Sequence, residues 1–259
     1  MRITCIQMNM QFCRPEENFL RVSELVEKAM ADTPDVLLLP ETWNTGFYPK
    51  ENPETLADLR GQRTKALLGA LAAKHRVNIV AGSVTDLRDG QLYNTCYVFD
   101  RMGQSIAAYD KIHLFSPMGE DRVYTPGCDL CRFTLDGVRC GVIICYDLRF
   151  PELSRKLCLE GTDILFLPSQ WPSVRTGQLH ALAAARAIEN QIYLACCNSC
   201  GTAEETVFGG RSAIFDPWGN ILAEAGTEEI HITAACDLSD LQNLRTAIPV
   251  YRDRKPELY

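Results

Sequence analysis

Short apolar runs alternate along this chain with polar turn residues, and the spacing predicts a fold rich in β-strands. The runs contain many Val and Ile residues and are bounded by Gly, Pro, Asn and Asp, as strands commonly are. The predicted strands cover residues 3–7, 36–39, 78–84, 95–99, 104–109, 140–144, 164–167, 192–197, 212–215 and 231–236.

Longer segments at 18–30, 56–74 and 177–190 repeat their apolar residues at helical spacing. Tight turns at DRMG (100–103), DG (136–137) and DPWG (216–219) predict hairpins between the flanking strands. Helices and hairpins together indicate an α/β fold, with sheets of mixed direction covered by helices. The pattern leaves open whether there is one sheet or two. We find no linker or repeat, so residues 1–259 are expected to form a single domain.

The composition excludes several classes of protein. A hydrophobic content of 46% and a charged content of 23% are ordinary for a globular chain. The net charge of -7 disfavours a nucleic-acid or anionic-membrane partner. No apolar run approaches the roughly eighteen residues of a membrane-spanning helix, and MRITCIQMNM does not read as a signal peptide. We expect a cytoplasmic protein with reduced cysteines.

Three predicted strands are followed at once by an ionisable residue. VLLLPE ends at Glu41, QSIAAYDK at Lys111 and GVIIC at Cys145. Ligands gather outside strand ends in helix-covered sheets, so these side chains can meet at one rim. A carboxylate can take the thiol proton, and an ammonium can lower the thiol pKa and stabilise an oxyanion. The set can hydrolyse an amide through a thioester.

Two other interpretations of the cysteines stay open at this point. A cysteine that ends an apolar strand is often only a small core residue. Cys128 and Cys131 form one CxxC pair, and Cys197 and Cys200 form another, which allows a zinc or redox module.

Five segments in order resemble the signature segments of the nitrilase superfamily of carbon–nitrogen hydrolases. They are LLLPETWNTGF, YDKIHLF, CYDLRFPE, ARAIENQIYLACCNSCG and SAIFDPWGNILAEAG. The resemblance implies a four-layer αββα sandwich that pairs as a homodimer and needs no metal or organic cofactor. It implies that Glu41 is the general base, Lys111 the oxyanion-stabilising lysine and Cys145 the nucleophile. Glu120 best matches a second glutamate that assists them, with Asp121 as the competing position.

The segment after Cys145 has to turn sharply into a helix. Pro151 suits the first turn of that helix, because its missing N–H costs nothing there, and Gly161 suits its end. Asp147 and Arg149 are expected to form a local ion pair that braces this turn.

TWNTGF, HLF, QWP (170–172) and IPVY most resemble the ω-amidase group, which hydrolyses the terminal amide of small dicarboxylic monoamides such as 2-oxoglutaramate. Such a small-molecule substrate is an anion, so its pocket needs a cation beyond Lys111. Arg175 is the first candidate, because Arg grips a carboxylate with two hydrogen bonds.

For other residues of these segments we expect either a place in the lining of the pocket or a structural role. The predicted pocket lining is Tyr146, Trp171 and Phe47, whereas Arg186 is expected to be a structural partner of an acid such as Glu189. Deaminated-glutathione amidase and N-carbamoyl amidohydrolase activities remain alternatives.

Overall fold

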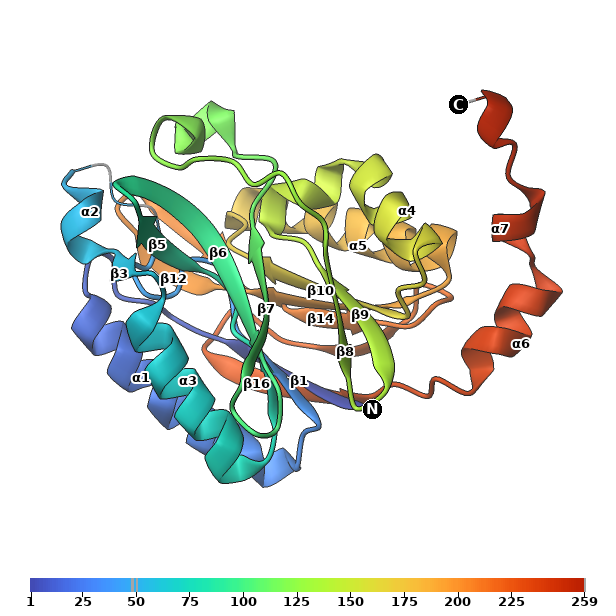
Figure 1. The fold of residues 1–259 in the computed structure, drawn as a ribbon, viewed down its shortest axis with the longest axis horizontal. Coiled ribbons are helices and arrows are strands. Elements are labelled where there is room, and N and C mark those ends of the chain that lie inside the picture. The colour runs from blue at the N-terminus through green and yellow to red at the C-terminus, as the bar shows by residue number, and fades with distance from the viewer. Residues whose placement is uncertain (48, 50, 259) are drawn as a thin grey trace.

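A computed structural model describes residues 1–47, 49 and 51–258, and shows two β-sheets packed face to face between two layers of helices (Figure 1). Helices α1 (Pro15–Ala29) and α3 (Gln62–His75) pack on the larger sheet. Helices α4 (Pro151–Leu159) and α5 (Thr176–Asn190) pack on the smaller sheet. This arrangement is the predicted four-layer αββα sandwich.

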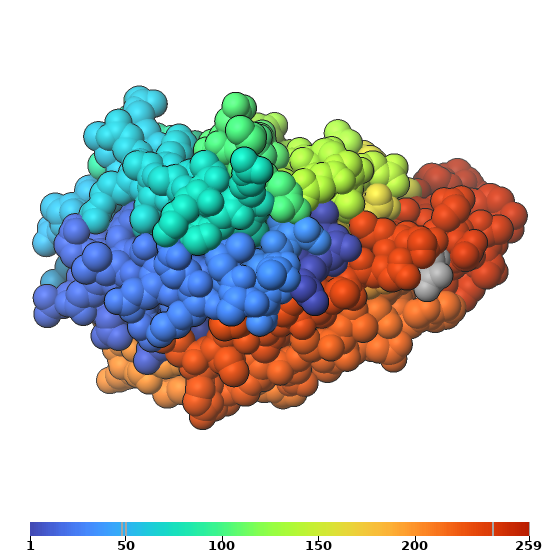
Figure 2. Space-filling model, turned by 90° about the horizontal axis from the view of Figure 1, so that it is seen from below, coloured from blue at the N-terminus to red at the C-terminus, as the bar shows by residue number. Residues whose placement is uncertain are grey.

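The larger sheet has the strand order β16-β1-β2-β4-β6-β5-β3, and β7 pairs with β6 beside this path. Its strands are β1 (Arg2–Gln7), β2 (Val36–Leu38), β3 (Asp58–Leu59), β4 (Asn78–Val80), β5 (Val84–Arg88), β6 (Gln91–Phe99), β7 (Ser105–Asp110) and β16 (Ile230–Ala235). β16 pairs with β1 in antiparallel direction, so the last strand of the chain lies beside the first. Figure 2 shows the resulting contact between the blue and the orange-red parts of the chain.

The smaller sheet has the order β15-β14-β11-β10-β9-β8. Its strands are β8 (Cys131–Leu135), β9 (Val138–Val142), β10 (Ile164–Ser169), β11 (Tyr193–Asn198), β14 (Ala213–Phe215) and β15 (Ile221–Glu224). A separate hairpin is formed by β12 (Cys200–Ala203) and β13 (Thr206–Gly209). The short helices are α2 (Pro53–Leu56), α6 (Asp240–Ala247) and α7 (Val250–Asp253).

Alternating side chains of each strand build the layers. On β10, Ile164 and Phe166 belong to the core between the two sheets. Leu165 and Leu167 belong to the core under α4 and α5. A strand that is buried on both faces has a continuous apolar run in its sequence. Such a run made β10 predictable.

The predicted helix at 56–74 is wrong at its start. The chain instead forms α2, then β3, and only then α3 from Gln62. Gly61 takes a left-handed φ of 60° directly before α3, and the Asp58 carboxylate accepts hydrogen bonds from the backbone N–H groups of Arg63 and Thr64. A carboxylate that binds the first free N–H groups starts a helix, so α3 begins here.

The predicted strand at 78–84 is divided in the structure. β4 ends at Val80 and β5 begins at Val84. Gly82 between them has a φ of 63°, in a turn where an added Cβ would collide with the Pro40 carbonyl oxygen. The hairpin turns at 100–103, 136–137 and 216–219 are confirmed, since each joins two antiparallel neighbours. β8 and β15, the hairpin partners of β9 and β14, are not among the strands predicted from the sequence.

The residues after β16 lie at one end of the molecule, where α6 and α7 extend beyond the sheets (Figure 1). Throughout residues 1–47, 49 and 51–258, none of the helices is both long enough and apolar enough to cross a membrane.

Candidate active site

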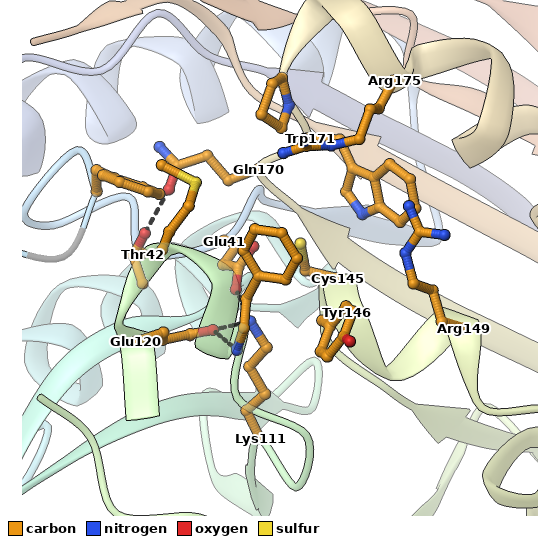
Figure 3. Close-up of a pocket in the computed structure, with 14 residues that line it drawn as sticks. Glu41, Thr42, Lys111, Glu120, Cys145, Tyr146, Arg149, Gln170, Trp171 and Arg175 are labelled. Atoms are coloured by element: carbon orange, nitrogen blue, oxygen red, sulfur yellow. Dashed lines mark hydrogen bonds and ion pairs between the residues drawn. The ribbon is translucent and has the colours of Figure 1, made fainter. Parts of the chain in front are cut away.

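A pocket opens where the ends of strands from both sheets meet (Figure 3). It is lined by Glu41, Thr42, Phe47, Lys111, Phe115, Met118, Glu120, Cys145, Tyr146, Arg149, Gln170, Trp171, Pro172 and Arg175. Glu41 and Lys111 follow β2 and β7 of the larger sheet, whereas Cys145 follows β9 of the smaller sheet. The predicted meeting of three strand ends is therefore present in the structure.

Two contacts hold the sheets together at this rim. The backbone N–H of Glu41 donates to the carbonyl of Ser169 at 3.4 Å. Next to it, Thr42 Oγ1 donates to Gln170 Oε1 at 2.7 Å. Because Glu41 and Cys145 belong to different sheets, these contacts set how closely their side chains approach.

Lys111 lies between two carboxylates in the buried part of the pocket. Its Nζ donates to Glu41 Oε1 at 2.8 Å and to Glu120 Oε2 at 2.8 Å. All three side chains are less than 5% exposed. Glu120 therefore reaches the site as predicted, whereas Asp121 is exposed.

A fourth polar residue, which the sequence did not indicate, belongs to this group. Asn94 on β6 is 1% exposed, and its Nδ2 donates to Glu41 Oε1 at 2.9 Å and to Glu120 Oε1 at 3.1 Å. The available signal was a polar residue in the middle of an apolar strand. We call Glu41, Asn94, Lys111 and Glu120 the inner floor of the pocket.

Cys145 is the first residue of a 3-10 turn that follows β9, and its φ of 49° is left-handed. A residue with a Cβ is strained in that conformation and is usually held there by its surroundings. The thiol and the Glu41 carboxylate are close enough to change each other's pKa. In Figure 3 the sulfur lies beside Glu41, between the inner floor and Trp171.

Asp147 braces this turn, but not through the predicted ion pair. Its fully buried carboxylate accepts hydrogen bonds from the Ile144 N–H, the Tyr109 hydroxyl and the His113 N–H. Arg149 instead donates to Gln178. Tyr109 and His113 flank Lys111 in the chain, so one carboxylate connects the segment of Lys111 to the segment of Cys145.

Arg186 has the structural role that was predicted for it. Its guanidinium pairs with Glu189 at 2.9 Å and donates to the carbonyl of Leu148. It thus fixes the far side of the turn that contains Cys145. Pro151 begins α4, also as predicted, and Gly161 follows its end with a φ of 104°.

The pocket changes the pKa values of its ionisable groups. Burial raises the pKa of Glu41, and the negative Glu120 adds to this effect while Lys111 opposes it. Burial alone would lower the pKa of Lys111, but Glu120 and Glu41 raise it well above its ordinary value. The ammonium therefore stays charged between them.

Lys111 lowers the pKa of Cys145, as expected, but other causes outweigh its effect. Burial raises the pKa of the Cys145 thiol well above its ordinary value, and the Glu41 charge raises it further. Lys111 does lower it, but by less than these two causes raise it. The resting thiol is protonated, so a base has to remove its proton when it reacts.

The mouth of the pocket is built from rings and guanidinium groups. Arg149 lies over the Trp171 ring at 4.7 Å, and Arg175 lies over the Phe115 ring at 5.4 Å. Both arginines are partly exposed, and no carboxylate of the described residues forms an ion pair with either. We call Phe115, Arg149, Trp171 and Arg175 the outer wall.

All predicted lining residues are confirmed as parts of the pocket. Tyr146 contacts the Phe115 ring edge-on, and Phe47 packs against Phe208. Arg149 is an addition, because its place in the sequence beside Asp147 suggested a role in the turn instead.

The two CxxC pairs do not form a metal centre. Cys128 is exposed, whereas Cys131 and Cys197 are buried in the core between the sheets. Cys197 Sγ donates to the carbonyl of Ile6. Among residues 1–47, 49 and 51–258, no three Cys, His, Asp or Glu side chains are grouped as metal ligands.

Comparison with known proteins agrees with this geometry. Residues 2–246 match the family described as Carbon-nitrogen hydrolase, which is nearly the whole chain. The chain belongs to the carbon–nitrogen hydrolase family. It is therefore a hydrolase of the nitrilase superfamily that acts on amides.

Two curated relatives of this carbon–nitrogen hydrolase span it almost completely. A 2-oxoglutaramate amidase of Bacillus subtilis (strain 168) is 42% identical over 99% of this chain and 98% of its own. Omega-amidase NIT2 of Homo sapiens is 32% identical over 100% of this chain and 96% of its own.

Solved structures share the fold. A variant of the amidase from Nesterenkonia sp. AN1 matches this hydrolase with a TM-score of 0.84 and 25% identity, over 97% of this chain and 99% of its own. Its description names a Michael addition of acrylamide at the active-site cysteine of that protein.

Proposed function

We propose that this carbon–nitrogen hydrolase cleaves the terminal amide of a small dicarboxylic monoamide, such as 2-oxoglutaramate, through a thioester on Cys145. The observation that carries the proposal is the sequence of charges along the pocket. The Cys145 thiol and the Glu41 carboxylate lie at its buried end. The guanidinium groups of Arg149 and Arg175 lie at its mouth, and among the described residues neither has a carboxylate partner.

The inner floor supports the first half of the reaction. Glu41 takes the Cys145 proton, and the sulfur attacks the amide carbonyl carbon. This transfer moves a proton between neighbours and leaves the total charge of the buried group unchanged. It therefore avoids burying a second uncompensated negative charge, which would be costly.

The carbonyl oxygen becomes an anion when the sulfur attacks. In this proposal Lys111 and the Tyr146 N–H bind it. The two oxygens of Glu120 can share one hydrogen of Lys111 Nζ, and Glu41 uses another, so one N–H remains for this oxyanion. When the C–N bond breaks, Glu41 returns its proton to the leaving nitrogen, and ammonia departs.

Water completes the cycle. Glu41 takes a proton from the water as its oxygen attacks the thioester carbon, and Glu120 holds Lys111 in place for the second oxyanion. The C–S bond then breaks, the acid leaves, and the Glu41 proton returns to the thiol. No step requires an oxidant, or a substrate other than the amide and water.

The outer wall supports the choice of substrate. Arg149 and Arg175 are held by Trp171 and Phe115 without an ion-pair partner in the described residues, so their charge is available to a ligand. A carboxylate at one end of a short substrate can bind there while its amide reaches Cys145. The names of the two curated relatives agree with this substrate class.

The test is product formation from 2-oxoglutaramate, succinamate, deaminated glutathione and N-carbamoyl-β-alanine, with Cys145→Ala as the blank. We expect Cys145-dependent turnover that is fastest on the first two. Turnover confined to either of the last two would overturn the substrate class and favour one of the alternative activities. Turnover that survives Cys145→Ala would overturn the mechanism. A single domain, a homodimer and a cytoplasmic location stay predictions.

A further inference from the structure

Asn94 touches both carboxylates of the inner floor. Its Nδ2 donates to Glu41 Oε1 at 2.9 Å and to Glu120 Oε1 at 3.1 Å. The same two oxygens also accept hydrogen bonds from Lys111 Nζ, at 2.8 and 2.9 Å. The four side chains therefore form a closed ring of hydrogen bonds, in which Asn94 is the neutral member.

The oxygen of the Asn94 side-chain amide shows what fixes the orientation of this amide. Its Oδ1 is buried, and no group in the described part of the chain donates a hydrogen bond to it. An unpaired buried acceptor is unfavourable. Rotating the amide by half a turn would nevertheless be worse, because Oδ1 would then face two carboxylate oxygens. The carboxylates thus determine the orientation of the amide.

The ring also distinguishes the two oxygens of Glu41. The hydrogen bonds from Asn94 and Lys111 both end on Oε1. Oε1 is then the less basic oxygen, and Oε2 is left for the Cys145 proton. The charged or titratable groups that face Glu41 are Lys111 after β7, Glu120 in the turn at 120–122, Cys145 after β9 and, at longer range, Tyr124.

We propose that Asn94 is a positioning residue for the general base: it binds Oε1 of ionised Glu41 and thereby directs Oε2 toward Cys145. The proposal rests on the role of Glu41 in the proposed function. An amide N–H donates more strongly to a carboxylate than to a carboxylic acid, so Asn94 also favours the ionised form of Glu41.

The experiment compares pH profiles of kcat/KM for the wild type, Asn94→Ala and Asn94→Asp. Removing a donor to the charged form raises the pKa of Glu41, so the acid limb of Asn94→Ala should move to higher pH by about one unit, a tenfold change in the ionisation constant. Asn94→Asp keeps the size of the side chain but places a third carboxyl group in the ring. Its acid limb should move further in the same direction.

Asn78→Ala is the matched control. Asn78 is a buried asparagine on β4 of the same sheet, and its Nδ2 donates to the Asp35 carbonyl and to Asp136 Oδ2, outside the pocket. Its replacement removes a buried amide without touching the inner floor. We expect it to change thermal stability and to leave the acid limb where it is in the wild type.

A second measurement does not depend on turnover. The rate of iodoacetamide labelling of Cys145 against pH has a step where Glu41 ionises, because the Glu41 charge raises the pKa of the thiol. The step should move to higher pH in Asn94→Ala. If the step in the labelling rate moves in Asn94→Ala but the wild type hydrolyses none of the amides, the positioning role of Asn94 is supported and the proposed function is overturned. Turnover with neither the step nor the acid limb moved would overturn the role of Asn94.

Discussion

The inner floor and the outer wall of the pocket differ in the burial and the pairing of their charged side chains. In the inner floor the carboxylates and the ammonium are buried and paired with one another. In the outer wall Arg149 and Arg175 are partly exposed and contact rings, with no acidic partner in the described chain. In the proposed function, the paired charges of the inner floor carry out the reaction, whereas the arginines of the outer wall select the substrate. Chemistry and selectivity are thus separated in space.

The largest expected effect comes from the residue between the two regions. Cys145→Ala should lower kcat by at least about 10⁴-fold on every substrate, because no other group can form the thioester. Binding should persist, since the outer wall is unchanged. Calorimetric titration with an unreacted substrate measures the second point. Loss of binding together with turnover would show that the two regions are not separable.

A smaller effect is expected from the outer wall. Arg149→Ala and Arg175→Ala should each raise KM for succinamate by about 10- to 100-fold and change kcat little, because a partly exposed charged hydrogen bond contributes about 1.5–3 kcal/mol. Butyramide, which has no carboxylate, should be hydrolysed equally by all three proteins. The control is Arg211→Ala, which removes an arginine paired with Glu224 outside the pocket. An equal loss on butyramide would contradict this division of roles.

The smallest effect concerns the thiol itself. Glu41→Gln should increase the rate of iodoacetamide labelling of Cys145 about tenfold at neutral pH, although it abolishes turnover. The Glu41 charge raises the pKa of Cys145, so its removal allows Lys111 to lower that pKa. Mass spectrometry of each labelled thiol measures the rates, with exposed Cys128 as the internal reference. Slower labelling of Cys145 would contradict this prediction. It would mean that Glu41 speeds alkylation by removing the thiol proton more than it slows alkylation by raising the thiol pKa.

The sequence predicted the parts of the site that follow strands. Glu41 and Cys145 come after apolar runs that form buried strands, whereas Lys111 comes after the more exposed β7, whose pattern also marked a strand. The four-layer arrangement and the role of Glu120 came from resemblance, because a loop glutamate has no local signal that distinguishes it from its neighbour Asp121.

Contacts between distant segments were not predictable in the same way. Asn94 lies 53 positions from Glu41 and becomes meaningful only when β6 and β2 share a sheet. Asp147 was expected to pair with Arg149 two positions away, but in the structure it binds Tyr109 and His113. Sequence proximity suggested a partner, and the packing of the two sheets supplied different ones.

The left-handed backbone at Cys145 has a consequence for how this protein can change. Glycine adopts a φ of 49° without strain, whereas cysteine does so at a cost of order 1 kcal/mol. Glycine at position 145 would relieve this backbone strain, at the cost of the contacts that the Cys145 side chain makes with the two cores on either side of the smaller sheet. If Cys145 is the nucleophile as proposed, the backbone strain at this residue is kept for the reaction, and the protein gives up some stability for turnover there.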